Sequence, residues 1–265
     1  MTKLLLTSGC SFSECTNSYI GTWPRHLYRS LRPHEYSEHR SSAMGSQGNG
    51  LISRGIIYQV TEALKTHQPG DILVGVMWSG GDRHDFRCTD PNLLGFVTKQ
   101  INNGWMKNPT GFVKNTEPHW VILNQHWAFD GNPEAETHYR LFHDDIGASI
   151  YSIEHVLRTQ WFLQSHGIPY FFSDYIDNNL GSIKNLQHTE VKYLYDQIDR
   201  GQYLPVTSEY NWVLGHAINA SELKPLPNNG PTWVRGVQHP TTEHHKEFTD
   251  QVIMPWLQLK EYLPG

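Results

Sequence analysis

The chain has 265 residues, of which 38% are hydrophobic and 12% aromatic, and its formal net charge is -5. This length can bury a full hydrophobic core, and this composition lies well outside the range of disordered chains. The charges form no block of one sign, and no basic patch with interleaved aromatic residues is found, which argues against a nucleic-acid surface. No apolar run approaches transmembrane length, so we expect no membrane span.

Cysteine and histidine usage indicates neither disulfides nor a metal site. The three cysteines, Cys10, Cys15 and Cys88, are too few to staple the chain, which favours a reducing compartment. The apolar run at residues 4–6 is too short for a signal peptide, so we expect a cytoplasmic protein. The sixteen histidines include no HExxH or HxH pattern, and His244-His245 are adjacent. We therefore expect scattered surface and loop histidines, no metal and no cofactor.

The sequence LLLTSGCSFS at residues 4–13 is typical of a buried strand that ends in a tight turn at Ser8-Gly9. This turn would place Ser11 at the carboxyl end of a first strand, where open α/β sheets bind their ligands. Ser11 is therefore a candidate nucleophile. The alternative is a serine-rich turn that caps the following helix.

A second glycine-rich turn, GSQGNG at residues 45–50, precedes a segment with helical periodicity at 51–64. A helix amino terminus presents backbone N–H groups and a partial positive charge to an anion or an oxyanion. Gly48 and Asn49 are therefore candidate donors. The phosphate-loop pattern GxxxxGK[ST] is absent, and a merely flexible turn is the remaining alternative.

The remaining segments alternate between helical and strand patterns. A strand at 71–78 leads into Ser79-Gly80-Gly81-Asp82-Arg83, and a helix at 149–166 leads into a strand at 168–174. This order predicts a three-layer α/β/α sandwich around a parallel sheet of about five strands, in a single domain over residues 1–265. Residues 86–147 lack clear periodicity and are interpreted as an insertion that shapes the pocket. Further expected elements are helices at 22–31, 190–198 and 210–220, a strand within 35–44, and a terminal helix after His239-Pro240.

Three of these features, Gly9-Cys10-Ser11, Gly48 and His239-Pro240, resemble in their order the sequence blocks of the SGNH (GDSL-like) hydrolases. The resemblance implies a flavodoxin-like fold in which Ser11 is the nucleophile and His239 the base. It also implies that Gly48 donates its backbone N–H to the oxyanion hole, with Asn49 as an additional donor.

The chain departs from the SGNH pattern at two positions. Ser79 follows the strand that usually leads into an asparagine donor, so either Ser79 or Asn49 replaces this donor, or only two donors remain. Gly236 stands three residues before His239, where the family carries its acid. Four alternatives follow: the protein works with a Ser–His dyad, a carboxylate from elsewhere such as Asp174 takes the place of the acid, a backbone carbonyl does so, or activity has been lost.

These patterns predict a serine esterase that hydrolyses a small acyl ester, with an O-acetyl group on a carbohydrate as one form of the substrate. Trp78 and Arg83 are candidate substrate-binding residues; Arg83 would bind an anionic group or pair with a nearby carboxylate. The expected partner is a small-molecule or glycan ester, with no nucleic acid and no membrane. Two alternatives stay open: an acyltransferase that uses the same serine and histidine, and a catalytically inactive SGNH-fold protein that binds a ligand.

Overall fold

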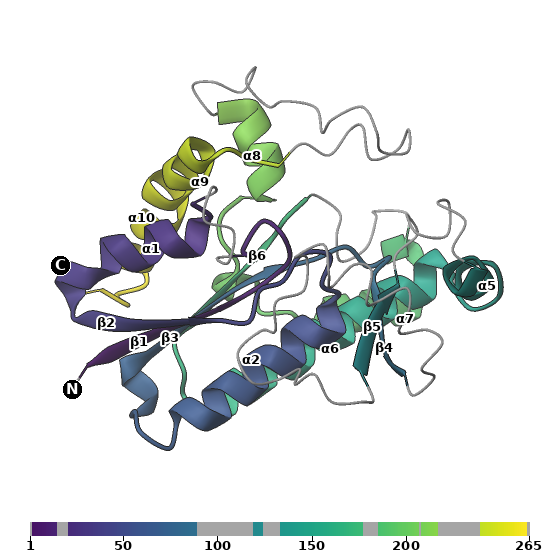
Figure 1. The fold of residues 1–265 in the computed structure, drawn as a ribbon, viewed down its shortest axis with the longest axis horizontal. Helices are drawn as coiled ribbons and strands as arrows, with labels where there is room; N and C mark the ends of the chain where they lie inside the picture. The colour runs from purple at the N-terminus through teal and green to yellow at the C-terminus, as the bar shows by residue number, and fades with distance from the viewer. Residues whose placement is uncertain are drawn as a thin grey trace.

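The computed structural model describes residues 2–14, 21–88, 119–123, 133–176, 185–206, 208–216 and 239–263. At its centre lies a four-stranded parallel sheet with the order β2-β1-β3-β6 (Figure 1). The strands are β1 (Lys3–Ser8), β2 (Tyr36–Ser41), β3 (Ile72–Trp78) and β6 (Tyr170–Asp174). Beyond β6, a single parallel bridge between Phe172 and Tyr203 begins a further position of the sheet.

Helices cover both faces of this sheet, which makes three layers (Figure 1). One face is covered by α2 (Asn49–Ala63), α6 (Asp145–Ser165) and α7 (Thr189–Tyr195). The other is covered by α1 (Trp23–Leu31), α8 (Glu209–His216), α9 (Thr242–Phe248) and α10 (Met254–Leu259), with a π-helical turn, Thr249–Ile253, joining the last two. Short 3-10 turns lie at Arg32–His34, Pro69–Asp71, Asn185–Gln187 and Arg200–Gln202.

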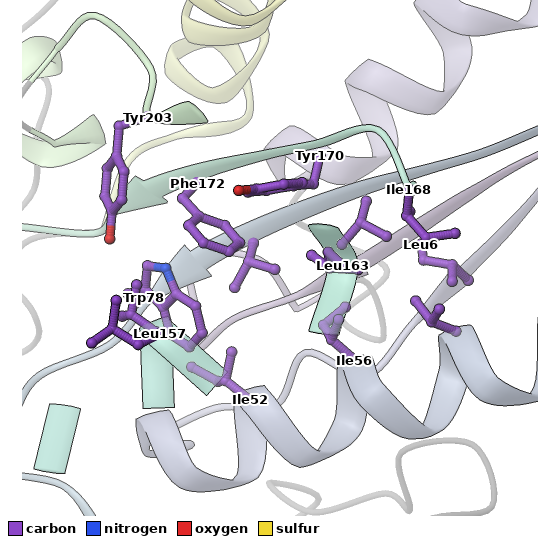
Figure 2. Packing of buried hydrophobic residues seen from close by; sticks show 14 of the residues in the cluster. Leu6, Ile52, Ile56, Trp78, Leu157, Leu163, Ile168, Tyr170, Phe172 and Tyr203 are labelled. Carbon is purple, nitrogen blue, oxygen red and sulfur yellow. The ribbon is translucent and has the colours of Figure 1, made fainter. Parts of the chain in front are cut away.

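The strands read as continuous apolar runs because both faces of the sheet are buried. In β1, Leu4 and Leu6 pack toward α2 and α6, whereas Leu5 packs toward α1 and α10. Figure 2 shows Leu6 within the first of these clusters, which also contains Ile56 of α2. All three leucines are fully buried, and each such side chain stabilises the fold by about 2 kcal/mol.

The predicted α/β/α sandwich with a parallel sheet is confirmed, with four strands in the described residues where about five were expected. The segment 86–147 holds more regular structure than its periodicity indicates: β4 (His84–Cys88) and β5 (His119–Leu123) form an antiparallel pair, and α5 (Pro133–Leu141) follows. The helix expected from 149 begins at Asp145 because the carboxylate of Asp144 accepts the N–H groups of Ile146 and Gly147. No described helix is long and apolar enough to cross a membrane.

Candidate active site

Ser11 lies in a tight turn directly after β1. The N–H of Ser13 donates to the carbonyl of Cys10 at 2.9 Å, which closes the turn around Ser11 and Phe12. Cys10, Phe12 and Ser13 are at most 1% exposed, and the indole N–H of Trp23 donates to Ser13 Oγ at 2.9 Å. The buried side chains on either side of Ser11 therefore fix the turn to the core, while the side chain of Ser11 stays partly exposed.

Gly9 is required at the start of this turn because nothing larger fits. A Cβ at this position would lie 2.3 Å from Ser13 Oγ and 2.9 Å from the carbonyl oxygen of Met77 in β3. Real Cβ atoms do not approach other atoms this closely, so an alanine would displace the turn from β3. The glycine of the Gly9-Cys10-Ser11 pattern thus fixes where Ser11 stands.

The structure brings Ser11 and His239 into direct contact. Ser11 Oγ and His239 Nε2 are 2.7 Å apart although the two residues are separated by 228 positions in sequence. His239 precedes the first turn of α9, which is capped by Thr241, and the Phe12 ring packs on the imidazole with a centroid separation of 4.9 Å. A hydroxyl and an imidazole at this distance can exchange a proton.

The surroundings of His239 keep its ring neutral. Burial, together with smaller effects of the nearby His245 and Arg83 in the same direction, lowers the pKa of His239 to about 4. At neutral pH the imidazole is therefore deprotonated and able to accept the Ser11 proton. Among the residues that the structure describes, no carboxylate forms a hydrogen bond with this ring; Gly236 lies outside them.

Asp174, the carboxylate suggested as a replacement acid, stands on the wrong face of the sheet. Side chains alternate along β6, so Asp174 shares the face of Phe172, which packs toward α2 and α6. Together with burial, it raises the pKa of Tyr203 on that same face. Phe12, on which His239 packs, belongs to the cluster on the opposite face, so the Asp174 hypothesis is wrong.

The backbone N–H of Gly48, the predicted oxyanion donor, is already engaged. It donates to Asp85 Oδ1 at 3.3 Å, and the N–H of Leu51 donates to Asp85 Oδ2 at 2.8 Å. Burial raises the pKa of Asp85 to about 6, although these two hydrogen bonds and the charges of Arg54 and Arg83 act in the opposite direction. A side-chain carboxylate thus occupies the amino terminus of α2, in contrast to the expected free donor.

Asn49 and Ser79 bind each other. The Asn49 amide donates to the Ser79 carbonyl at 2.9 Å and accepts the Ser79 N–H at 2.8 Å, which ties the start of α2 to the end of β3. Both residues are buried. Of the predicted donors in this pair, the Ser79 N–H is used, whereas the second amide proton of Asn49 and the hydroxyl proton of Ser79 have no bond in the described part of the chain.

Of the two predicted substrate-binding residues, Trp78 is wrongly assigned and Arg83 stays a candidate. Trp78 is fully buried among core residues and meets the Phe172 ring edge to face at 5.3 Å (Figure 2). Arg83 is partly exposed; it donates to Ser79 Oγ at 2.6 Å and lies over the Tyr175 ring at 5.2 Å. Within the described ranges no carboxylate lies at ion-pair distance from it, contrary to the expected pairing.

A buried His–Glu pair was not predicted. His245 Nδ1 and Glu209 Oε1 are 2.5 Å apart, and the two side chains are 1% and 0% exposed. The His245 ring meets Phe12 edge to face at 6.4 Å, so the pair lies behind the ring that supports His239. With His244 also buried, the expectation of scattered surface histidines is wrong here. Across the described residues, no group of three or more His, Cys, Asp or Glu side chains could hold a metal ion.

Comparisons with known proteins give little beyond this geometry. No family model matches the chain, and no curated protein matches it. Among solved structures it is similar to the lipase Lip_vut3 from a goat rumen metagenome, at 10% identity and a TM-score of 0.40, over 98% of each chain. The assignment of function therefore depends on the arrangement of side chains in the site.

Proposed function

We propose that the protein is an ester hydrolase of the SGNH type, in which Ser11 is the nucleophile and His239 the general base. The observation that carries this proposal is the 2.7 Å contact between Ser11 Oγ and His239 Nε2 at the end of β1. The neutral state of the imidazole, which follows from its lowered pKa, supports it. The substrate class is a small acyl ester, including an O-acetyl ester of a carbohydrate.

In the first half-reaction, Ser11 Oγ attacks the ester carbonyl while His239 Nε2 accepts the hydroxyl proton. The tetrahedral intermediate then collapses: the bond to the alcohol oxygen breaks, and His239 returns its proton to that oxygen. In the second half-reaction, His239 removes a proton from water, which attacks the acyl-serine. When this second intermediate collapses, the bond between the acyl carbon and Ser11 Oγ breaks, His239 returns its proton to that oxygen, and the acid is released.

The oxyanion needs donors that are not already used. We assign this role to the backbone N–H of Ser11 and the second amide proton of Asn49, with the Ser79 hydroxyl as a third group. The Gly48 N–H would join them only if Asp85 released it. Loss of one such donor typically lowers the rate by about 100-fold to 1,000-fold.

Among the described residues His239 has no carboxylate partner to stabilise its positive charge. Burial and the charges of His245 and Arg83 oppose protonation of His239, so each transfer from Ser11 is energetically uphill. We therefore expect slow turnover, with labelling of Ser11 by a reactive probe easier to detect than hydrolysis of an unactivated ester.

The direct test is labelling with a fluorophosphonate probe, followed by mass mapping of the modified residue. We expect labelling at Ser11 in the wild type and its loss in Ser11→Ala and His239→Ala. Ser37→Ala and His166→Ala, which change exposed residues outside the site, serve as matched controls and should label normally. Absence of labelling in wild-type protein with a native circular dichroism spectrum would contradict the proposal and favour the inactive ligand-binding protein.

A further inference from the structure

A cavity of about 170 Å³ lies at the start of α2, and its lining includes Arg83, whose charge lowers the pKa of His239. Its walls come from the first turns of α2, the loop after β3, the start of β4 and the middle of α6, and they include Arg54, Arg83, Asp85 and His155. At about 30 Å³ for each water-sized group, it has room for a fragment of about five or six such groups. This volume suits one end of a small ester.

Arg83 connects the cavity with the catalytic pair. Its guanidinium lies over the Tyr175 ring at 5.2 Å, and Tyr175 meets Phe12 edge to face at 5.3 Å. Phe12 in turn packs on His239 at 4.9 Å. A hydrogen bond from Arg83 to the Cys10 side chain also places it next to the residue that precedes Ser11. Arg83 therefore belongs to the cavity lining and is linked to His239 through the rings of Tyr175 and Phe12.

The charge in the cavity is positive. Arg54 and Arg83 contribute two cationic groups, and Asp85 is the one carboxylate among the described lining residues, with its oxygens bound to the backbone N–H groups of Gly48 and Leu51. Burial lowers the pKa of His84 and of His155 to about 4 each, so these imidazoles are neutral at pH 7. The described lining residues thus carry two formal positive charges and one negative charge.

Arg83 forms no ion pair in the described part of the chain, although Asp82 and Asp85 interact with its charge at longer range. In the described ranges it meets a hydroxyl, an aromatic ring and a thiol, none of which replaces the hydration of a cation. A second point of convergence lies at Gly50, where a Cβ would stand 2.9 Å from Arg54 Nη1, 3.2 Å from His155 Nε2 and 2.8 Å from Asp85 Oδ2. The absence of a side chain at Gly50 keeps these three polar groups close together around one point.

We propose that the cavity binds a negatively charged oxyacid group of the ester substrate, with Arg83 as the main recognising residue and Arg54 as the second. The inference rests on the proposed ester hydrolase function, because it seats the scissile carbonyl at Ser11 and the anionic end of the same molecule at Arg83. A carboxylate, a sulfate and a phosphate share this chemistry, and a guanidinium can bind each of them through two parallel hydrogen bonds.

The first test uses two esters that differ only at their far end, 4-nitrophenyl hemisuccinate and 4-nitrophenyl butyrate. A charge-assisted contact contributes about 1.5–3 kcal/mol, so we expect a preference for the hemisuccinate of roughly 10-fold to 100-fold in kcat/KM. Arg83→Gln should abolish most of the preference and Arg54→Gln part of it. Arg29→Gln, an exposed arginine of α1, is the control and should keep it. An equal kcat/KM for both esters, or a preference that survives in Arg83→Gln, would overturn the inference.

The second test does not need hydrolysis and so separates the anion site from the catalytic proposal. Isothermal titration of Ser11→Ala with the two esters should give tighter binding of the hemisuccinate, and adding Arg83→Gln should remove the difference. If the wild type hydrolyses neither ester but this difference is found, the hydrolase proposal fails and the anion site stands. Equal binding of both esters to Ser11→Ala overturns the anion site. Displacement of the hemisuccinate by free succinate, sulfate or phosphate then identifies the preferred acid.

Discussion

The two halves of the candidate site differ in how their hydrogen-bonding groups are used. At the end of β1, the chain neighbours Cys10, Phe12 and Ser13 are buried, and the Ser11 hydroxyl meets a neutral imidazole. At the start of α2, the Gly48 N–H is bound to Asp85 and the Asn49 amide to Ser79. In the proposed mechanism the half with Ser11 and His239 can therefore react as it stands, whereas the hydrogen-bonding groups of the proposed oxyanion half are largely bound to other protein groups.

This difference shows that a helix amino terminus is not automatically an anion site. A carboxylate near the first turn gains about 0.3–1 kcal/mol from the helix dipole, but Asp85 also loses hydration by burial. Its pKa of about 6 indicates that the loss outweighs the gain. The Asp85 carboxylate is thus poorly hydrated, and it becomes protonated at a higher pH than an exposed aspartate.

We expect the largest effect from substitutions that remove Ser11 or His239. Ser11→Ala and His239→Ala should each lower the rate of probe labelling or ester hydrolysis by on the order of 10³-fold or more, because each removes one end of the same proton transfer. The double variant should lose no more than either single variant. Rate measurements on the three variants check this. Multiplicative losses in the double variant would show that the two residues act separately.

The next largest effect is a loss of stability when Asn49, at the start of α2, is replaced. Asn49→Ala removes both hydrogen bonds to Ser79 and leaves a buried N–H and carbonyl unpaired, at a cost of about 2–3 kcal/mol in the free energy of unfolding. Urea denaturation measures this loss, and Gln68→Ala, at an exposed position, should stay within about 0.5 kcal/mol of wild type. A stability of Asn49→Ala equal to that control would mean that α2 is not fastened through this side chain.

Local patterns in the sequence were enough to predict the scaffold and the two residues, Ser11 and His239, that the structure brings into contact. The apolar runs at residues 4–6 and 71–78 predict β1 and β3, and the two blocks that carry Ser11 and His239 lie next to a strand end and a helix start, where the structure brings them together. The polar segment that contains β4, β5 and α5 has too little hydrophobic periodicity to indicate its elements, because β4 and β5 form a separate two-stranded pair outside the main sheet.

The prediction of a free Gly48 donor was wrong because the group that binds its N–H is distant along the chain. Nothing near Gly48 indicates that Asp85, 37 positions later, would take its N–H. The pairing of Glu209 with His245 depends likewise on the docking of α8 against α9. Trp78 was assigned to the substrate because it ends a strand, yet in a sheet buried on both faces the pattern cannot tell a core position from a pocket position.

A smaller effect is the pH dependence of stability that arises from Asp85, the residue bound at the start of α2. Its pKa is raised from 3.8 to about 6 in the folded protein, so the folded state binds this proton more tightly than the unfolded state. The contribution of Asp85 to stability is therefore present below about pH 4 and is lost as the pH rises through about 6, by on the order of 2 kcal/mol. Asp85→Asn lacks this dependence, so its stability relative to wild type should rise between pH 4 and pH 7. Denaturation curves of both proteins at pH 4 and pH 7 measure this change. A stability difference that is the same at both pH values would contradict the burial of an ionised Asp85.

The smallest effect concerns the pH dependence of Ser11 itself. A base with a pKa of about 4 stays neutral down to about pH 5, so the rate of fluorophosphonate labelling should remain level from pH 8 to pH 5 and fall with a midpoint near 4. A histidine with the ordinary pKa of about 6.5 would already have lost about nine-tenths of its neutral form at pH 5.5. Labelling rates over short times, with circular dichroism at each pH to verify the fold, distinguish these cases by about tenfold at that pH. A midpoint near 6.5 would mean that water or a carboxylate reaches His239 and stabilises its charged form, and the nucleophile half would then be a triad in function.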